Sequence, residues 1–559
     1  MKPVVRRWLS SLTLSQKVAQ LVVIPFYGEA PNTRSRQYQR FLRLVREQRV
    51  GGLVLINRSR GRGIQKAEPY AVAAFLNRMQ RIAAIPLLVA GDFERGASMR
   101  IDGTTLFPHA MAFAATGDPK ATRYEGEITA RDSRALGVHW IFFPVADVNS
   151  NPDNPVINIR SFGENPKDVA AHVRAFIEGA RDDTEHRVLT TAKHFPGHGD
   201  TAVDSHLAMP SIQADRAHLE TVEMTPFRAA IESGVDSVMT AHIALPALEA
   251  ADVPATLSPA IMTGLLRDEL NFKGLVVTDA LEMGGVVKGF SKGEAAVRAI
   301  EAGADVLLMP PDPETAIRAV VAAVRSGRLT VKRIDRSVTR VLEAKQSLGL
   351  DRSRLVNLEA IADIVNSPEA AAKAQEIADH AVTLVRNGDG LVPLRDPKQT
   401  AFLILTESRY GVQGQAIQQE LAARGGAAQV ITLDPAMPDS ELDAAAERLA
   451  PARDIVVMAF ASAGSYRGDL SLPGGYPRLI ETLLAREAPV TLVSLGSPYL
   501  VRSFPKAKAY LTTYSPVPTS EAAAVKALFG EIDIRGHLPV RIPEVAEIGF
   551  GIDLPRRAK

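Results

Sequence analysis

The sequence predicts an α/β protein with two domains, an N-terminal (β/α)8 TIM-like barrel and a C-terminal α/β sandwich. With 559 residues the chain is too long for one ordinary hydrophobic core. Over the first 350 residues, short apolar runs alternate with amphipathic segments, and a second series of the same kind begins near residue 380. We therefore predict a barrel over residues 1–350, a linker over 351–379 and a sandwich over 380–559.

Eight apolar runs predict the strands of the barrel. Each run is short, rich in Val, Ile, Leu or Phe and mostly without polar alternation, as in strands that are buried on both faces. The runs cover residues 21–24, 52–56, 86–91, 140–145, 188–192, 237–241, 274–278 and 305–309. Eight strand-helix alternations fit a (β/α)8 barrel. An open doubly wound sheet is the alternative, because periodicity does not count strands reliably.

Amphipathic stretches between these runs predict the helices. Thr13-Leu14-Ser15-Gln16 is a capping-box pattern that opens a short first helix. Further helices are predicted over residues 71–82, 166–181, 215–233 and 258–270, and a last one over 331–348 closes the unit.

The second series predicts a three-layer α/β sandwich. Its apolar runs cover residues 382–385, 402–405, 430–433, 455–460, 491–495 and 510–513. Helical stretches lie near residues 413–424, 440–449, 477–486 and 520–529.

Composition and charge exclude several classes of protein. The net charge is +2 without a long block of like charge, which argues against nucleic acid as the main partner. The absence of cysteine excludes disulfides, thiolate metal sites and a cysteine nucleophile. No apolar run approaches the roughly 18 residues that span a bilayer. Residues 1–11 are basic without an apolar signal core, so we expect a cytoplasmic protein, or a periplasmic or secreted one if a leader has been removed. No pattern in the sequence indicates an oligomeric state.

Residues 193–206 concentrate more ionisable groups than any other stretch. These groups are Lys193, His194, His198, Asp200, Asp204 and His206. Pro196, Gly197 and Gly199 interrupt the preceding apolar run and favour an irregular loop. A loop at the end of a strand is where a rigid scaffold usually presents catalytic groups.

Polar residues directly follow several predicted strands, and in a barrel such positions share one face. They are Asp92, Asp147, Lys193, His194, His242 and Asp279. Asp279 is the best nucleophile candidate, because an apolar strand would hold its carboxylate rigidly, as retaining glycoside hydrolysis requires. The alternative is an N-cap for the next helix.

Asp204 and His206 are the candidates for proton transfer. An imidazole titrates near neutrality, and a neighbouring carboxylate orients the ring and stabilises its charged form. The alternative is a solvated surface pair.

The nitrogen and oxygen donors of the same loop also suit a metal-dependent hydrolase. Two features argue against this alternative. Pro196-Gly197 separates His194 from His198, so no helix presents them together, and Lys193 repels a cation. We therefore predict no metal and no cofactor.

The loop over 193–206 strongly resembles that of the β-N-acetylglucosaminidases of glycoside hydrolase family 3. Residues 147–163 look like the substrate-binding segment of that family, residues 274–283 like its nucleophile segment, and residues 380–543 like its C-terminal sandwich domain. In the β-glucosidases of the same family the acid/base is usually a glutamate from the second domain, and this loop is absent.

The resemblance implies that Asp279 is the nucleophile and that His206 is the acid/base, with Asp204 as its partner. It further implies five sugar-binding residues, which are Asp92, Arg100, Arg160, Lys193 and His194. Cationic donors and a carboxylate acceptor suit sugar hydroxyls. Arg95 stands where the family usually has a second glycine, and we expect it to reshape the edge of the sugar pocket. The second domain is expected to carry no catalytic residue.

These assignments imply a retaining exo-β-N-acetylglucosaminidase that works by double displacement. The expected partner is an oligosaccharide, either a cell-wall muropeptide or a short chain that contains N-acetylglucosamine. The alternatives are a phosphorylase with the same chemistry, a β-glucosidase or β-xylosidase, and a non-catalytic carbohydrate-binding or scaffold protein.

Overall fold

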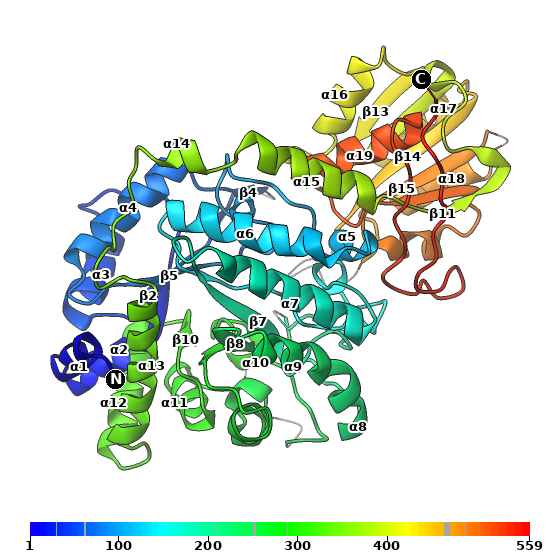
Figure 1. Cartoon of the computed structure of the whole chain (residues 1–559). Helices are drawn as coiled ribbons and strands as arrows, with labels where there is room; N and C mark the ends of the chain where they lie inside the picture. The colour runs from blue at the N-terminus through cyan, green and yellow to red at the C-terminus, as the bar shows by residue number, and fades with distance from the viewer. Residues whose placement is uncertain are drawn as a thin grey trace.

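The computed structural model describes residues 1–29, 31–60, 63–205, 207–249, 253–287, 289–462, 470–486 and 488–558. Eight parallel strands form the sheet of the N-terminal domain, in the order β10-β1-β2-β5-β6-β7-β8-β9 (Figure 1). A parallel bridge between Val277 and Val306 joins the two ends of this order. The predicted (β/α)8 barrel is therefore confirmed, and it replaces the open doubly wound sheet.

Each of the eight predicted runs overlaps one barrel strand. The strands are β1 (Val22–Phe26), β2 (Gly52–Leu55), β5 (Leu88–Gly91), β6 (Trp140–Ile141), β7 (Leu189–Phe195), β8 (Ser237–Thr240), β9 (Leu275–Thr278) and β10 (Leu307–Leu308). A hairpin of β3 (Arg58–Arg60) and β4 (Gly63–Gln65) follows β2. The runs are recognisable because both faces of these strands are buried, one in the barrel and one under the helices.

β7 is longer than its apolar run, which corrects one prediction. Lys193 and His194 lie inside the strand rather than in the loop after it. Backbone bonds hold them there, since Lys193 N donates to Pro144 O at 3.1 Å and Ala241 N donates to Phe195 O at 2.7 Å. The pairing with β8 shifts register between Lys193 and Phe195, which marks a bulge at His194. The irregular loop begins only at Pro196.

Helices surround the barrel. They are α1 (Pro3–Ser10), α2 (Leu14–Ala19), α3 (Arg36–Arg43), α4 (Pro69–Ile82), α5 (Ala110–Ala115), α6 (Pro119–Ala135), α7 (Pro166–Asp182), α8 (Arg216–His218), α9 (Met224–Glu232), α10 (Gly284–Val287), α11 (Lys292–Ala302), α12 (Pro313–Arg325) and α13 (Val331–Ser347). Wider π-helical turns cover Leu44–Gln48, Leu219–Glu223 and Ala260–Glu269. The predicted capping box opens α2, where Thr13 and Gln16 exchange two hydrogen bonds.

The second domain has one six-stranded sheet in the order β11-β16-β15-β14-β12-β13. Its strands are β11 (Thr383–Asn387), β12 (Thr400–Leu405), β13 (Gln429–Leu433), β14 (Asp454–Ala461), β15 (Val490–Gly496) and β16 (Ala509–Thr512). β11 pairs antiparallel to β16, and the other pairs are parallel.

Helices cover both faces of this sheet. They are α16 (Gln415–Ala423), α17 (Asp439–Leu449), α18 (Tyr476–Leu484) and α19 (Pro518–Phe529). Alternate residues of one strand enter separate cores, as Phe402 packs with α16 and α19 while Leu403 packs with α17 and α18. The predicted α/β sandwich is confirmed.

Two helices lie between α13 and β11 in the chain, α14 (Ile361–Ile364) and α15 (Pro368–Ala381). Figure 1 shows α15 running across the barrel towards the second domain. Ala370, Ala374 and Ile377 belong to the barrel core, whereas Ala378 and Ala381 belong to the cores of the second domain. One helix therefore packs against both domains. Across the described part of the chain, no helix has the length and apolar character needed to cross a membrane.

Candidate active site

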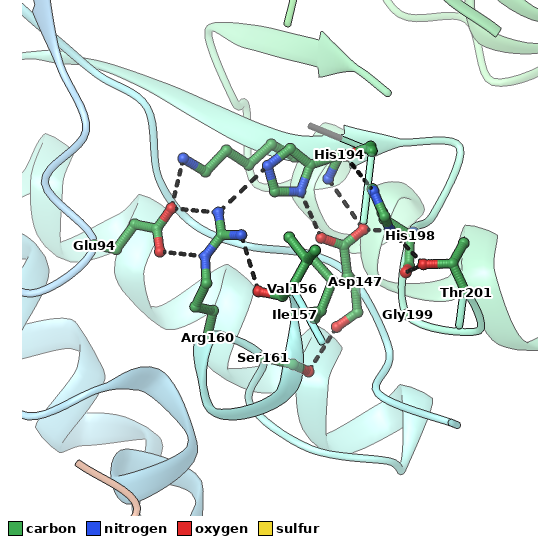
Figure 2. A network of polar contacts seen from close by, with 12 residues as sticks. Glu94, Asp147, Val156, Ile157, Arg160, Ser161, His194, His198, Gly199 and Thr201 are labelled. Carbon is green, nitrogen blue, oxygen red and sulfur yellow. Dashed lines mark hydrogen bonds and ion pairs between the residues drawn. The ribbon is translucent and has the colours of Figure 1, made fainter. Parts of the chain in front are cut away.

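Polar side chains gather at the carboxyl ends of β5, β6 and β7, which are neighbours in the barrel. Five of the predicted residues are linked there by direct contacts, namely Asp92, Arg100, Arg160, Lys193 and His194. Glu94, which the sequence does not assign to the site, and Asp147, one of the strand-end residues, connect them into one network. Figure 2 shows the part of this network around Glu94, Arg160, His194 and Asp147.

Asp92 lies between two cations. Its Oδ1 is 3.1 Å from Lys193 Nζ, and its Oδ2 is 3.0 Å from Arg100 Nη2. Burial raises the pKa of this carboxyl, but the charges of Lys193 and Arg100 outweigh burial and bring the pKa below its ordinary value. The side chain of Asp92 is 27% exposed and that of Lys193 only 2%. Asp92 is therefore an ionised carboxylate that still has surface available for a ligand.

Glu94 holds Arg160 and Lys193 in place. Arg160 donates to it through Nε at 2.8 Å and Nη2 at 2.7 Å, and Lys193 Nζ lies 2.7 Å from Oε1. Burial raises the pKa of Glu94, yet Arg160 and Lys193 lower it well below its ordinary value. This bidentate pair fixes the guanidinium plane of Arg160. The only sequence signal for Glu94 is its place between Asp92 and Arg100.

Asp147 is fully buried and orients His194. Its Oδ2 is 2.7 Å from His194 Nδ1, and its Oδ1 accepts from the backbone amides of His194 at 3.1 Å and His198 at 2.7 Å. Burial raises the pKa of Asp147, but His194 more than compensates and lowers it. The contact at Nδ1 directs Nε2 of His194 towards Arg160, 3.5 Å away (Figure 2). Asp147 is therefore an orienting group, a role that its strand-end position does not specify.

The loop after β7 rests on the segment that follows β6. Asn154 Nδ2 donates to His198 O at 2.9 Å and to Gly199 O at 3.0 Å. A Cβ on Gly199 would lie 1.7 Å from Val148 O, so only glycine fits this approach. The predicted loop therefore owes one of its glycines to a backbone contact.

His198 is the histidine of this loop that the structure describes, and both of its ring nitrogens face protein partners. His198 Nδ1 is 2.8 Å from Thr201 Oγ1, and Nε2 is 2.9 Å from Ser205 Oγ. Burial lowers the pKa of His198 to about 4, so its ring is neutral at pH 7. Among the residues that the structure describes, no group of three or more His, Asp or Glu is arranged to hold a metal ion.

Asp279 directly follows β9, two strands beyond β7 in the barrel order. Its backbone N donates to Thr240 O at 3.2 Å, and its Oδ1 accepts from Ala280 N at 2.7 Å. His242 supports the same segment, since its Nε2 lies 3.0 Å from Ala280 O. Asp279 lies five residues before α10, so it does not cap that helix. The side chain is half-buried at the rim of the barrel.

Asp204 is buried in the loop after β7, while His206 lies outside the described residues. The loop reaches the segment that follows Asp279, because Gly285 N donates to Ser205 O at 3.2 Å. The loop that carries Asp204 therefore extends from the network around Lys193 to the rim near Asp279.

Arg95 is half-buried beside the network. The pKa of its guanidinium is lowered to about 10, mainly by burial and also by the charge of Arg100, while Glu94 opposes the shift. Its charge also acts on Lys66, whose pKa is lowered by burial and then by Arg95. Arg95 therefore adds positive charge at this edge of the site.

Comparisons with known proteins identify the family. Residues 13–344 match the family model described as "Glycosyl hydrolase family 3 N terminal domain". Residues 293–556 match the model described as "Glycosyl hydrolase family 3 C-terminal domain". A β-N-acetylglucosaminidase/β-glucosidase of Cellulomonas fimi is 29% identical over 554 residues, covering 96% of this chain and 95% of the relative.

Two solved structures are also similar. A family 3 β-N-acetylglucosaminidase from Paenibacillus sp. str. FPU-7 has a TM-score of 0.85 and 34% identity, covering 95% of this chain and 99% of that one. A β-glucoside phosphorylase, BglX, has a TM-score of 0.84 and 25% identity, covering 97% of this chain and 96% of that one. With family descriptions matched along nearly its whole length, the chain belongs to glycosyl hydrolase family 3.

Proposed function

We propose that the protein is a retaining exo-β-N-acetylglucosaminidase that removes terminal N-acetylglucosamine by double displacement. One observation carries the proposal. The loop with Asp204 is anchored by the Gly285–Ser205 hydrogen bond on the segment that follows Asp279. An acid/base on this loop would therefore work next to a nucleophile on the strand end.

The network around Lys193 would hold the terminal sugar, whose anomeric carbon is attacked. Asp92 has an exposed carboxylate edge to accept from hydroxyl groups, and Arg160 offers donors. Glu94 fixes Arg160, and Asp147 orients His194 beside it, before the substrate arrives, which reduces the ordering that binding requires.

In the first step Asp279 attacks the anomeric carbon while His206 gives a proton to the leaving oxygen. The bond to the leaving group breaks and a glycosyl-enzyme intermediate forms. In the second step His206 takes a proton from water, and the water oxygen displaces Asp279 from the sugar. Asp204 would orient the His206 ring and stabilise its charged form before the first step and after the second.

We further propose that its natural substrates are cell-wall muropeptides or short oligosaccharides that contain N-acetylglucosamine. The names of two similar proteins support N-acetylglucosamine as the sugar that is removed, since both are called β-N-acetylglucosaminidases. The only support for a muropeptide or oligosaccharide as the natural substrate is that the loop over residues 193–206 resembles the loop of those enzymes.

The test compares nitrophenyl N-acetyl-β-glucosaminide with nitrophenyl β-glucoside under the same conditions. We expect a higher kcat/KM for the N-acetylglucosaminide and activity that survives exhaustive chelation. A higher kcat/KM for the glucoside would reverse the substrate assignment, and no turnover of either sugar would favour a non-catalytic carbohydrate-binding protein.

A phosphorylase is the second candidate, because the chain is similar over its whole length to a β-glucoside phosphorylase. In that reaction phosphate replaces water in the second step. We expect free sugar as the product even when phosphate is added. Accumulation of sugar 1-phosphate would identify the phosphorylase instead.

A further inference from the structure

We propose that the second domain positions the sugar-binding Arg160, and that Tyr499 and the hydrophobic cluster around Ile159 are its positioning contacts. The inference rests on the proposed role of Arg160 in sugar binding. It concerns residues 147–163, which we call the bridging segment because it carries Asp147 and Arg160 and also contacts the second domain.

The first contact is a buried hydrogen bond between the domains. Asn149 Nδ2 donates to Tyr499 OH at 3.0 Å. Asn149 is fully buried and Tyr499 is 5% exposed, so water cannot readily replace the tyrosine. Asn149 stands two residues after Asp147, which orients His194.

The second contact is hydrophobic. Ile159, directly before Arg160, is fully buried and belongs to a cluster of the second domain rather than to the barrel core. Its cluster includes Tyr499, Tyr514, Leu538 and Val540. The short helical turn Asn158–Arg160 therefore has its apolar side chain in one domain and its cation in the site of the other.

The third contact closes the far end of the bridging segment. A Cβ on Gly163 would lie 2.5 Å from Pro539 O, and Glu164 N donates to the same oxygen at 3.0 Å. Arg541 N donates to Glu164 Oε2 at 2.8 Å. The bridging segment thus meets the second domain near its start, at Ile159 and at its end.

The buried contacts matter more than the ion pair at the surface. Arg502 Nη1 lies 2.7 Å from Asp153 Oδ1, but the Asp153 side chain is 68% exposed. Exposed ion pairs of this kind contribute little, because water screens them and both side chains lose freedom. We therefore assign the positioning to Tyr499 and to the packing of Ile159.

Internal bonds transmit this support to the site. Ser161 Oγ donates to Asp147 O at 2.7 Å, and Asn149 N donates to Gly163 O at 2.8 Å. A shift at either end of the bridging segment therefore moves Asp147 and Arg160 together. Arg160 tolerates little movement, because its fork must meet both oxygens of Glu94.

The kinetic test is a double-mutant cycle on the full-length enzyme with the nitrophenyl N-acetylglucosaminide. Tyr499→Phe and Ile159→Ala are each expected to lower kcat/KM by about tenfold, mainly through KM. In an Arg160→Ala background the same changes are expected to cost less than about twofold, because the residue they position is gone. Equal losses in both backgrounds would overturn the proposal, since a general loss of folded enzyme is independent of Arg160.

Tyr514→Phe is the matched control. Tyr514 is a buried tyrosine of the same cluster, but its OH contacts Thr383 Oγ1 within the second domain, at 2.7 Å. We expect Tyr514→Phe to leave KM unchanged. A tenfold loss in this control as well would show that the cluster acts only through folding and would count against the proposal.

Hydrogen exchange gives a readout that needs no substrate. Peptides that cover residues 156–163 are expected to exchange about tenfold faster in Tyr499→Phe than in the wild type or in Tyr514→Phe. Unchanged exchange would overturn the positioning role even if the enzyme is active. If exchange rises while the wild type turns over no N-acetylglucosaminide, the proposed substrate fails and the positioning role stands.

Discussion

Some residues of the site hold other side chains in place, whereas others keep exposed atoms that are available to a sugar. Glu94 and Asp147 direct their carboxylate oxygens to protein donors and are almost fully buried. Asp92 keeps an exposed edge. This division explains how Lys193 and Arg160 are accommodated in the site, because each cation lies within reach of a carboxylate.

Replacing Asp279 tests the nucleophile at this scale. Asp279→Ala is expected to lower kcat by at least about a thousandfold, because no other group would form the glycosyl-enzyme bond. Added azide would enter from the vacated side and form a glycosyl azide of inverted configuration, detectable by mass spectrometry and NMR. Activity near the wild-type value would remove Asp279 from the mechanism.

His206 is tested by the leaving group. His206→Ala is expected to lower kcat/KM about 100- to 10,000-fold for glycosides with a poor leaving group such as methoxide. The loss should be much smaller for nitrophenolate, which departs without a proton. Equal losses on both glycosides, as expected for Asp279→Ala, would show that His206 is not the acid.

At the scale of the structural element, the loop after β7 is shaped by what it packs against. Asn154 binds two of its carbonyl groups, and Gly199 touches the backbone at Val148. The loop is therefore held at its base while its far part reaches Gly285.

Gly199→Ala tests this packing. A Cβ placed 1.7 Å from Val148 O must displace the loop or the bridging segment, and backbone cannot yield as a side chain does. We expect at least a tenfold loss of kcat/KM and a lower melting temperature, measured by nitrophenyl release and calorimetry. Gly264→Ala is the control, because its Cβ would meet no atom nearer than 4.0 Å. The packing argument fails if both variants behave like the wild type.

At the scale of the whole molecule, the helix that closes the barrel carries a fully buried lysine. Lys345 lies in α13, and its Nζ donates to Gln20 Oε1 at 2.7 Å. Burial lowers the pKa of Lys345 to about 7. The side chain thus joins the end of the barrel to its start through a hydrogen bond rather than an ion pair.

This lysine makes stability depend on pH. Between about pH 7 and the ordinary pKa near 10.5, the unfolded chain binds more protons at this position than the folded protein does. The free energy of unfolding should therefore rise with pH across this window and level off below about pH 7. In urea titrations at pH 7, 8 and 9, Lys345→Met is expected to show a smaller rise than the wild type. Lys332→Met, at an exposed position of the same helix, should keep the wild-type rise, and an unchanged slope in Lys345→Met would contradict the assignment.

Both domains contribute to the geometry of one site, the barrel through its own residues and the second domain through the bridging segment. The barrel supplies every residue to which we assign a catalytic or sugar-binding role. The second domain instead touches the bridging segment, and α15 packs against the cores of both domains. Their relative position is therefore part of the geometry around Arg160.

The sequence by itself determined the strands and the positions at their ends. Strands buried on both faces leave continuous apolar runs, and this local signal located all eight barrel strands and five strands of the sandwich. β13, at the edge of the second sheet, has exposed residues between its buried ones, and its apolar composition alone located it. The apolar runs also located Asp92, Asp147 and Asp279, because a barrel places strand ends on one face.

Only the tertiary structure decided which of these residues hold the others. Glu94 meets Arg160 across 66 positions of the chain, and Asn149 meets Tyr499 across 350. Such contacts leave no periodic pattern, because periodicity records which face of an element is buried and not what lies opposite. The same limit applies to Lys193 and His194, whose place in β7 depends on backbone bonds to neighbouring segments rather than on apolar side chains.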